Sequence, residues 1–137
     1  MVLAEVLIEK NILDEKIKEM RRYLFRMVSV SAEEADKATK RLIELIDKHR
    51  SHLILINKVN NSIEVTIGDS KISLANALLI SQTMDRKIDL LNELINDCDE
   101  DTVLNIFSLI DQRDKLLDEY ILISNQLEAI EWGTEVD

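Results

Sequence analysis

The two histidines of the chain, His49 and His52, stand three residues apart, a spacing that places both imidazoles on one face of a helix. Two imidazoles arranged in this way can bind a metal ion when a third ligand is close to them. No third ligand is evident nearby in the sequence, and we therefore expect no metal site. We interpret His49 as a residue at the edge of the core that bonds a neighbour, and His52 as a surface residue.

Two acidic pairs, Glu44-x-x-Asp47 and Glu128-x-x-Glu131, are of the kind that holds magnesium in helical nucleotide pyrophosphatases. Those enzymes use Glu-x-x-Glu followed by Glu-x-x-Asp on adjacent helices, whereas the two pairs here occur in the reverse order and far apart. Short acidic spacings arise by chance in a chain with 27 acidic residues. A metal-dependent hydrolase is therefore kept only as an alternative function.

Other signatures of an active site are missing from the sequence. Cys98 lies between Asp97 and Asp99, whose negative charges disfavour a thiolate. A di-iron bundle needs Glu-x-x-His on two helices, and Ile46 stands three positions before His49. With only two glycines, the chain has no glycine-rich phosphate loop. We therefore expect no catalytic residue and no cofactor.

The composition is typical of long helices in one domain. The 137 residues are 46% hydrophobic and 4% aromatic, and they include no proline. We expect a single helical-bundle domain over residues 1–137. A net charge of -10 repels phosphate groups, which argues against nucleic acid and anionic membranes as partners.

Three features predict a cytoplasmic protein. Cys98 is the only cysteine, so no intramolecular disulfide can form. Glu5 stands where a secretory signal would have its basic and apolar regions. The longest uncharged stretch, residues 72–84, has 13 residues and is too short to cross a bilayer core of about 30 Å, so we expect no integral membrane segment.

Apolar residues recur at alternating spacings of three and four along four segments, which predicts four amphipathic helices. We expect them over about 2–28 and 32–60, then from Ser73 to the acidic cluster 97–101, and from that cluster to Gly133. The expected seam of the second helix consists of Leu42, Ile46, His49, Leu53, Ile56 and Asn60. The expected N-terminal cap of the second helix is a capping box of Ser31 with Glu34. The expected cap of the third helix is Ser73, and that of the fourth is Asp99 or Asp101.

In residues 62–67 the apolar side chains recur at every second position, as in a β-strand, and no longer at the helical spacing. The dipeptide Gly68-Asp69 then separates this segment from residues 70–72. This pattern predicts a short β-hairpin between the second and third helices. The short connections make sequence neighbours antiparallel and predict an antiparallel four-helix bundle with coiled-coil-like packing. The alternative is two long helical hairpins that splay apart and are completed by the same hairpins of a second chain.

Four segments are apolar nearly all round, namely 6–8, 53–56, 78–80 and 120–123. In the predicted bundle all four lie at the end that carries the β-hairpin, and we therefore expect a non-enzymatic, self-associating protein that forms a homo-oligomer through this hairpin end. The candidate interface residues are Leu7, Ile8, Ile54, Leu55, Val65, Leu79, Ile80, Ile121, Leu122 and Trp132. The alternatives are that the β-hairpin and the C-terminal tail cover these residues, that another protein binds them, or that they contact a membrane.

The polar residues Asn57 and Asn60 near the end of the second helix are expected to close that helix and bond the β-hairpin. Asp85 and Arg113 are expected on or near the inner faces of the third and fourth helices, where a buried pair would fix the helix register. We assign these four residues structural roles.

Short motifs spread along the chain resemble the septicolysin-like family of small helical bacterial proteins. They are Leu3-Ala4-Glu5, Ile56-Asn57-Lys58-Val59-Asn60, Gly68 ahead of Ser73-Leu74 and Ala77, Asp85, and Glu131-Trp132. The similarity covers nearly the whole chain. It implies a helical fold without established catalytic residues, and the family name suggests a membrane-active, lysin-like protein as an alternative function.

Overall fold

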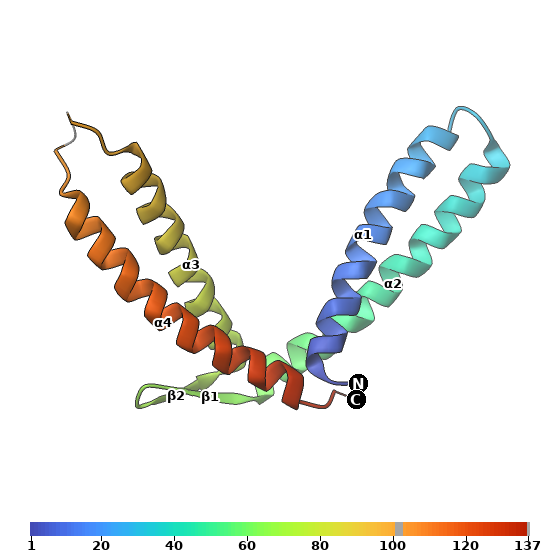
Figure 1. Ribbon diagram of the computed structural model, residues 1–137. Coiled ribbons are helices and arrows are strands. Elements are labelled where there is room, and N and C mark those ends of the chain that lie inside the picture. Colours follow the sequence, from blue (N-terminus) through green and yellow to red (C-terminus); the bar gives the residue numbers. More distant parts are fainter. Residues whose placement is uncertain (101–102, 137) are drawn as a thin grey trace. The chain divides into compact units, whose positions relative to one another are not determined.

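The computed structural model describes residues 1–100 and 103–136 as four α-helices and one β-hairpin (Figure 1). The elements in chain order are α1 (Leu3–Met27), α2 (Ala32–Ser62), β1 (Glu64–Ile67), β2 (Ser70–Ser73), α3 (Leu74–Asp97) and α4 (Ile106–Gly133). The predicted fold class, all-α with a short β-hairpin between the second and third helices, is confirmed.

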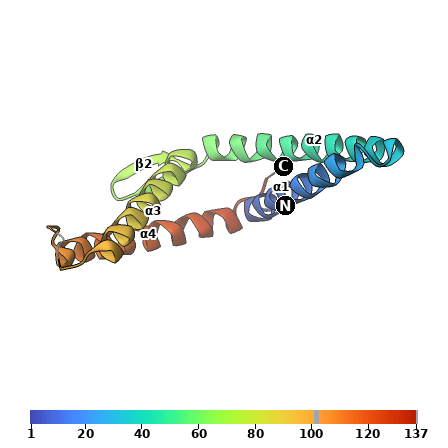
Figure 2. The same ribbon diagram turned by 90° about the horizontal axis from the view of Figure 1, so that it is seen from above.

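The chain divides into two compact units, with boundaries inside α2 and α4. The first unit contains residues 1–59 together with the chain from residue 131 onward, and the second contains residues 60–130. In each unit two helices lie side by side and antiparallel, α1 with α2 and α3 with α4 (Figures 1 and 2).

In the first unit, α1 and α2 pack through a seam of apolar side chains. The buried members are Leu3, Val6 and Leu13 on α1 and Ala38, Leu45, Ile56 and Val59 on α2. The chain leaves α1 at the β-branched and hydroxyl residues 28–31 and enters α2 with a cap, because the Glu34 amide donates to Oγ of Ser31 at 3.3 Å. Ser31 thus caps α2, as predicted, whereas the Glu34 carboxylate bonds Tyr23 and does not return to the cap.

The C-terminal tail belongs to the first unit and pairs with the start of the chain. The Leu3 amide donates to the Thr134 carbonyl oxygen at 2.7 Å, and the Val136 amide donates to that of Met1 at 2.9 Å. Val136 is buried by this pairing, whereas Trp132 stays 52% exposed. The tail therefore anchors the start of α1 without burying its tryptophan.

The seam of α2 differs from the predicted one at every second position. Ile46 and Leu53, which were expected to be buried, are 48% and 37% exposed, whereas Leu45 and Val59 are buried. The observed seam consists of Ala38, Leu42, Leu45, His49, His52, Ile56 and Val59. Both versions obey the three-four spacing and share several residues, so periodicity alone cannot distinguish them. Contact with α1 selects the observed one.

In the second unit, α3 and α4 each bury a seam of apolar residues. The buried residues are Leu74, Ala77, Ile88 and Leu91 on α3 and Leu109, Ile123 and Leu127 on α4. The β-hairpin joins this core through Val65, which is 2% exposed. The side-chain amide of Gln126 on α4 donates to the Thr66 carbonyl oxygen at 2.8 Å and fixes the hairpin against that helix.

The turn of the β-hairpin depends on one glycine. Ile67 pairs with Ser70, so Gly68 and Asp69 form a two-residue loop, and Gly68 has a φ of +59°. A positive φ at the first loop residue matches the right-handed twist of the strands and favours glycine there. Ser73 then caps α3, because its Oγ accepts from the Asn76 amide at 3.1 Å. The predicted turn and cap are confirmed.

The N-terminal cap of α4 is Asn105. The prediction of Asp99 as this cap is therefore wrong. The other candidate, Asp101, lies outside the described residues. Oδ1 of Asn105 accepts from the amides of Phe107 at 3.0 Å and Ser108 at 3.3 Å. Asparagine and aspartate cap helices about equally well, so the sequence offered several candidates for one position.

Candidate functional site

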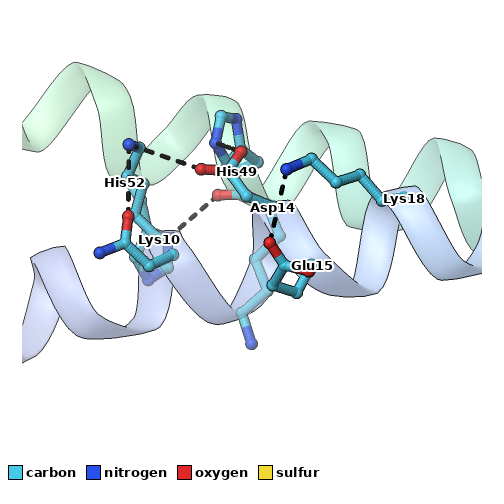
Figure 3. Close-up of polar contacts among 8 residues, drawn as sticks. Lys10, Asp14, Glu15, Lys18, His49 and His52 are labelled. Carbon is cyan, nitrogen blue, oxygen red and sulfur yellow. Dashed lines mark hydrogen bonds and ion pairs between the residues drawn. The ribbon is translucent and has the colours of Figure 1, made fainter.

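Polar side chains interrupt the apolar seam between α1 and α2, and Figure 3 shows how they meet. Glu9, Lys10 and Asp14 come from α1, and His49 and His52 come from α2. The two histidines face α1 because their positions belong to the observed seam of α2. This cluster is the candidate functional site.

His52 uses both ring nitrogens. Nδ1 lies 3.0 Å from the Lys48 carbonyl oxygen, and Nε2 lies 2.7 Å from Oε2 of Glu9. A carbonyl oxygen and a carboxylate are both acceptors, so only the protonated imidazole can donate to both at once. The interpretation of His52 as a surface residue is wrong, since its side chain is only 13% exposed. The shifted seam of α2 is the cause.

The pKa of Glu9 lies below its ordinary value. The main cause is the hydrogen bond from His52, and the positive charges of His52 and Lys48 act in the same direction, whereas partial burial opposes them. Glu9 is therefore held as a carboxylate. This charged acceptor strengthens the link that His52 forms between the two helices.

His49 meets Asp14 in a second contact between the helices. Its Nε2 lies 2.7 Å from Oδ1 of Asp14, but the direction of approach falls outside hydrogen-bond geometry, so this nitrogen has no hydrogen-bond partner among the described residues. Nζ of Lys10 lies 3.5 Å from Oδ2 of the same carboxylate. His49 thus lies at the edge of the core, as predicted, but its Nε2 does not form the predicted hydrogen bond to a neighbour.

An imidazole beside a carboxylate can serve acid-base catalysis when it also reaches a nucleophile or a substrate. Here the two nitrogens of His52 already have partners, and the nearby Ser51 hydroxyl donates to the Asp47 carbonyl oxygen of its own helix at 3.2 Å. Within residues 1–100 and 103–136, no group of three or more His, Cys, Asp or Glu side chains is placed to hold a metal ion. The arrangement is suited to joining α1 to α2 in one register.

Most of the predicted interface residues are exposed. They are Ile8, Ile54, Leu79, Ile80, Ile121, Leu122 and Trp132, while Leu7 and Leu55 are half-buried. Val65 is the exception, because the alternation of β1 turns it into the core of its own unit, where it is 2% exposed. Val65 is therefore unavailable to a partner, and its prediction as an interface residue was wrong.

The predicted structural pair of Asp85 and Arg113 is not formed as expected. Asp85 is exposed on α3, and Arg113 instead donates from Nη1 to Oδ1 of Asn92 at 3.3 Å. Asp85 and Asn92 are one heptad apart, so they share a face of α3, and the packing register selects Asn92. Asn57 is exposed and Asn60 is half-buried, and their predicted closing role stays a prediction.

Sequence reasoning named Ile121 as an interface residue but missed the rest of the apolar stripe on α4 to which it belongs. Phe107 is 76% exposed, Leu117 is 38% exposed and Ile121 is 48% exposed. These residues follow the same three-four spacing as the buried seam, displaced by one position. The displaced repeat is the signal that could have revealed the stripe.

Fold and site together define an all-α protein of four helices and a β-hairpin, in which polar side chains join α1 to α2. A solved structure described as that of a functionally unknown conserved protein from Corynebacterium diphtheriae has this fold, with a TM-score of 0.87. The two sequences are 20% identical, and the match covers 100% of this chain and 99% of the other. This likeness shows the fold alone.

Neither a family model nor a curated protein matches the chain. Among the helices of the described residues, none is both long and apolar enough to cross a membrane.

Proposed function

We propose that this chain is a non-enzymatic helical protein that works by associating with a second copy of itself. The observation that carries the proposal is the exposure of large apolar side chains on regular helices. Ile43 on α2 is 55% exposed, Leu79 on α3 is 59% exposed, and Phe107 on α4 is 76% exposed. Clusters of such residues on a protein surface usually mark a contact with a partner.

The charge of the chain favours a protein partner over the alternatives. A net charge of -10 repels nucleic acid and anionic lipid, because both carry negative charge themselves. Two copies of the chain repel each other too, but salt at physiological strength screens charges that are more than about 8 Å apart. Apolar contact is not screened in this way, so it can hold two acidic copies together.

The test is the molar mass in solution, measured by light scattering after gel filtration of the full chain over a range of concentrations up to tens of micromolar. We expect a mass of at least two chains, falling towards one chain on dilution. A mass of one chain at every concentration would refute self-association.

The lysin-like alternative is tested in parallel with neutral phosphatidylcholine vesicles loaded with a dye. We expect the chain neither to bind these vesicles nor to release the dye. Dye release by a chain that stays monomeric would replace the proposal with a membrane-active function. The resemblance to the septicolysin-like family and the cytoplasmic location stay predictions.

A further inference from the structure

Two stripes on different helices have the same spacing of residues. On α2 the stripe consists of Ile43, Ile46, Arg50, Leu53 and Asn57. On α4 it consists of Phe107, Ile110, Asp114, Leu117 and Ile121. In both stripes successive members are three, four, three and four residues apart, which is the spacing of a coiled-coil seam.

Both stripes lie on the surface of their units, beside the seams that are already packed. On α2, Ile43 is 55% exposed and Ile46 is 48% exposed. On α4, Phe107 and Ile121 are exposed and Ile110 is half-buried. The α2 stripe belongs to the first unit and the α4 stripe to the second.

The central residue of each stripe carries a charge, and the two charges are opposite. Arg50 is the middle member on α2, and Asp114 is the middle member on α4. Both are exposed, and Asp114 is 3.2 Å from Nη2 of Arg113 on its own helix. In an antiparallel helix pair the middle of one stripe meets the middle of the other, so Arg50 would face Asp114 between apolar neighbours.

We propose that the α2 stripe of one copy packs antiparallel against the α4 stripe of a second copy, with Arg50 facing Asp114 across the contact. The inference rests on the proposed self-association and names its surface. A two-fold dimer forms this contact twice, because each copy supplies one stripe of each kind. Pairing α2 with α2 would oppose two arginines, so the charges select the mixed pairing.

The test uses the two single charge reversals, Arg50→Asp and Asp114→Arg, in the full chain. Each variant places like charges at both contacts of its own dimer, and we expect its dissociation constant to rise by about tenfold or more. The second variant lowers the net negative charge, so general repulsion alone would strengthen its association. Weaker association of both variants is therefore specific to the stripes.

Mixing the two variants in equal amounts is the decisive measurement. In the mixed dimer, the introduced aspartate of one chain faces the introduced arginine of the other, and the native arginine faces the native aspartate at the second contact. We expect the mixture to associate about as tightly as the wild type. Sedimentation of the variants alone and mixed measures this directly.

Lys40→Asp on α2 and Asp111→Arg on α4 are the matched controls. They make the same charge changes at exposed positions outside the stripes. We expect each control to change the dissociation constant by less than about threefold. Circular dichroism of all the variants should show the helix content of the wild type, because every substituted side chain is on the surface.

Three results would overturn the inference. If the wild type dimerises and both reversals dimerise equally well, the surface is wrong and the proposed function stands. If the double variant Arg50→Asp/Asp114→Arg restores association while the mixture of single variants does not, the stripes meet within one chain. If the wild type is a monomer, the surface and the proposed function both fail.

Discussion

The phenol of Tyr23 donates a hydrogen bond of 3.0 Å to Oε2 of Glu34 and joins the end of α1 to the first turn of α2. The amide of Glu34 also donates to Oγ of Ser31, and Oε1 of its carboxylate lies 4.0 Å from Nζ of Lys37. In a full capping box its carboxylate would turn back to the cap, and here it crosses to the neighbouring helix instead. The bond raises the pKa of Tyr23, since the negative carboxylate favours the protonated phenol.

Replacing this acceptor should lower the pKa of Tyr23. In Glu34→Gln the negative charge is lost, and we expect the pKa to return towards the ordinary tyrosine value of about 10. Phenolate absorbance reports the titration in a Tyr120→Phe background, where Tyr23 is the only tyrosine left. Glu15→Gln is the control, because among the described residues Glu15 pairs with Lys18 at 3.4 Å and with no partner of Tyr23 or Glu34, and it should leave the titration unchanged.

The sign of the effect of Tyr23 on stability follows from the same shift. A raised pKa means that the folded state holds the phenol proton more firmly than the unfolded state does. The contribution is fully present below a pH of about 10 and is lost as the pH rises through the raised pKa. Urea unfolding should therefore show the wild type losing more stability than Glu34→Gln across that alkaline range, and equal losses would contradict this assignment.

The bond between Glu9 and His52 predicts an acid-sensitive link. Because the pKa of Glu9 is lowered in the folded state, its contribution to stability is present above the ordinary glutamate pKa of about 4.3 and is lost as the pH falls through the lowered value. His52→Gln should raise the pKa of Glu9, as measured by NMR titration of its carboxyl carbon. In His49→Gln the Glu9 titration should stay as in the wild type, and an equal shift in both variants would disprove the specific pairing.

Two leucines of α3 should differ sharply in their effect on stability. Leu74 has 0% exposure, so Leu74→Ala leaves a cavity and should lower the free energy of unfolding by about 2–5 kcal/mol. Leu79 is on the surface of the same helix, and Leu79→Ala should change it by no more than about 0.5 kcal/mol. Urea unfolding at a concentration where the chain is monomeric measures both. Similar losses would mean that Leu79 is covered in the folded monomer.

The cap of α4 should be visible in the stability of the chain. Asn105→Ala removes the acceptor for two amides and should cost about 1 kcal/mol. Asn105→Ser keeps a capping oxygen and should recover most of this loss. If thermal unfolding of the serine variant matches that of the alanine variant, the capping role is wrong.

Much of the fold could be predicted from local patterns. The three-four spacing predicted a helix over about 2–28, and α1 spans Leu3–Met27. The change of period and the Gly68-Asp69 dipeptide predicted the hairpin that β1 and β2 form. Such features depend on residues close in sequence, and therefore they can be recognised without knowing the packing.

The polar contacts of the candidate site could not be predicted in the same way. Asp85 was predicted as the partner of Arg113, whereas in the structure Arg113 bonds Asn92. Asp85 and Asn92 lie one heptad apart on the same face of α3, so the sequence does not distinguish them as partners. Glu9 and His52 are 43 residues apart in the chain, and no local pattern links them. Both contacts depend on the axial register of two packed helices, which side-chain volumes along the whole seam determine.

By itself, the sequence determined where helices and turns occur, because spacing, capping residues and glycine act over a few neighbouring positions. Only the tertiary structure decided which of two overlapping apolar repeats of α2 faces α1. A rotation of this helix by part of a turn exchanges Ile46 and Leu53 for Leu45 and His52, and both choices bury apolar surface. Packing against α1 selected the second choice, which placed His52 opposite Glu9 and left Ile46 and Leu53 exposed.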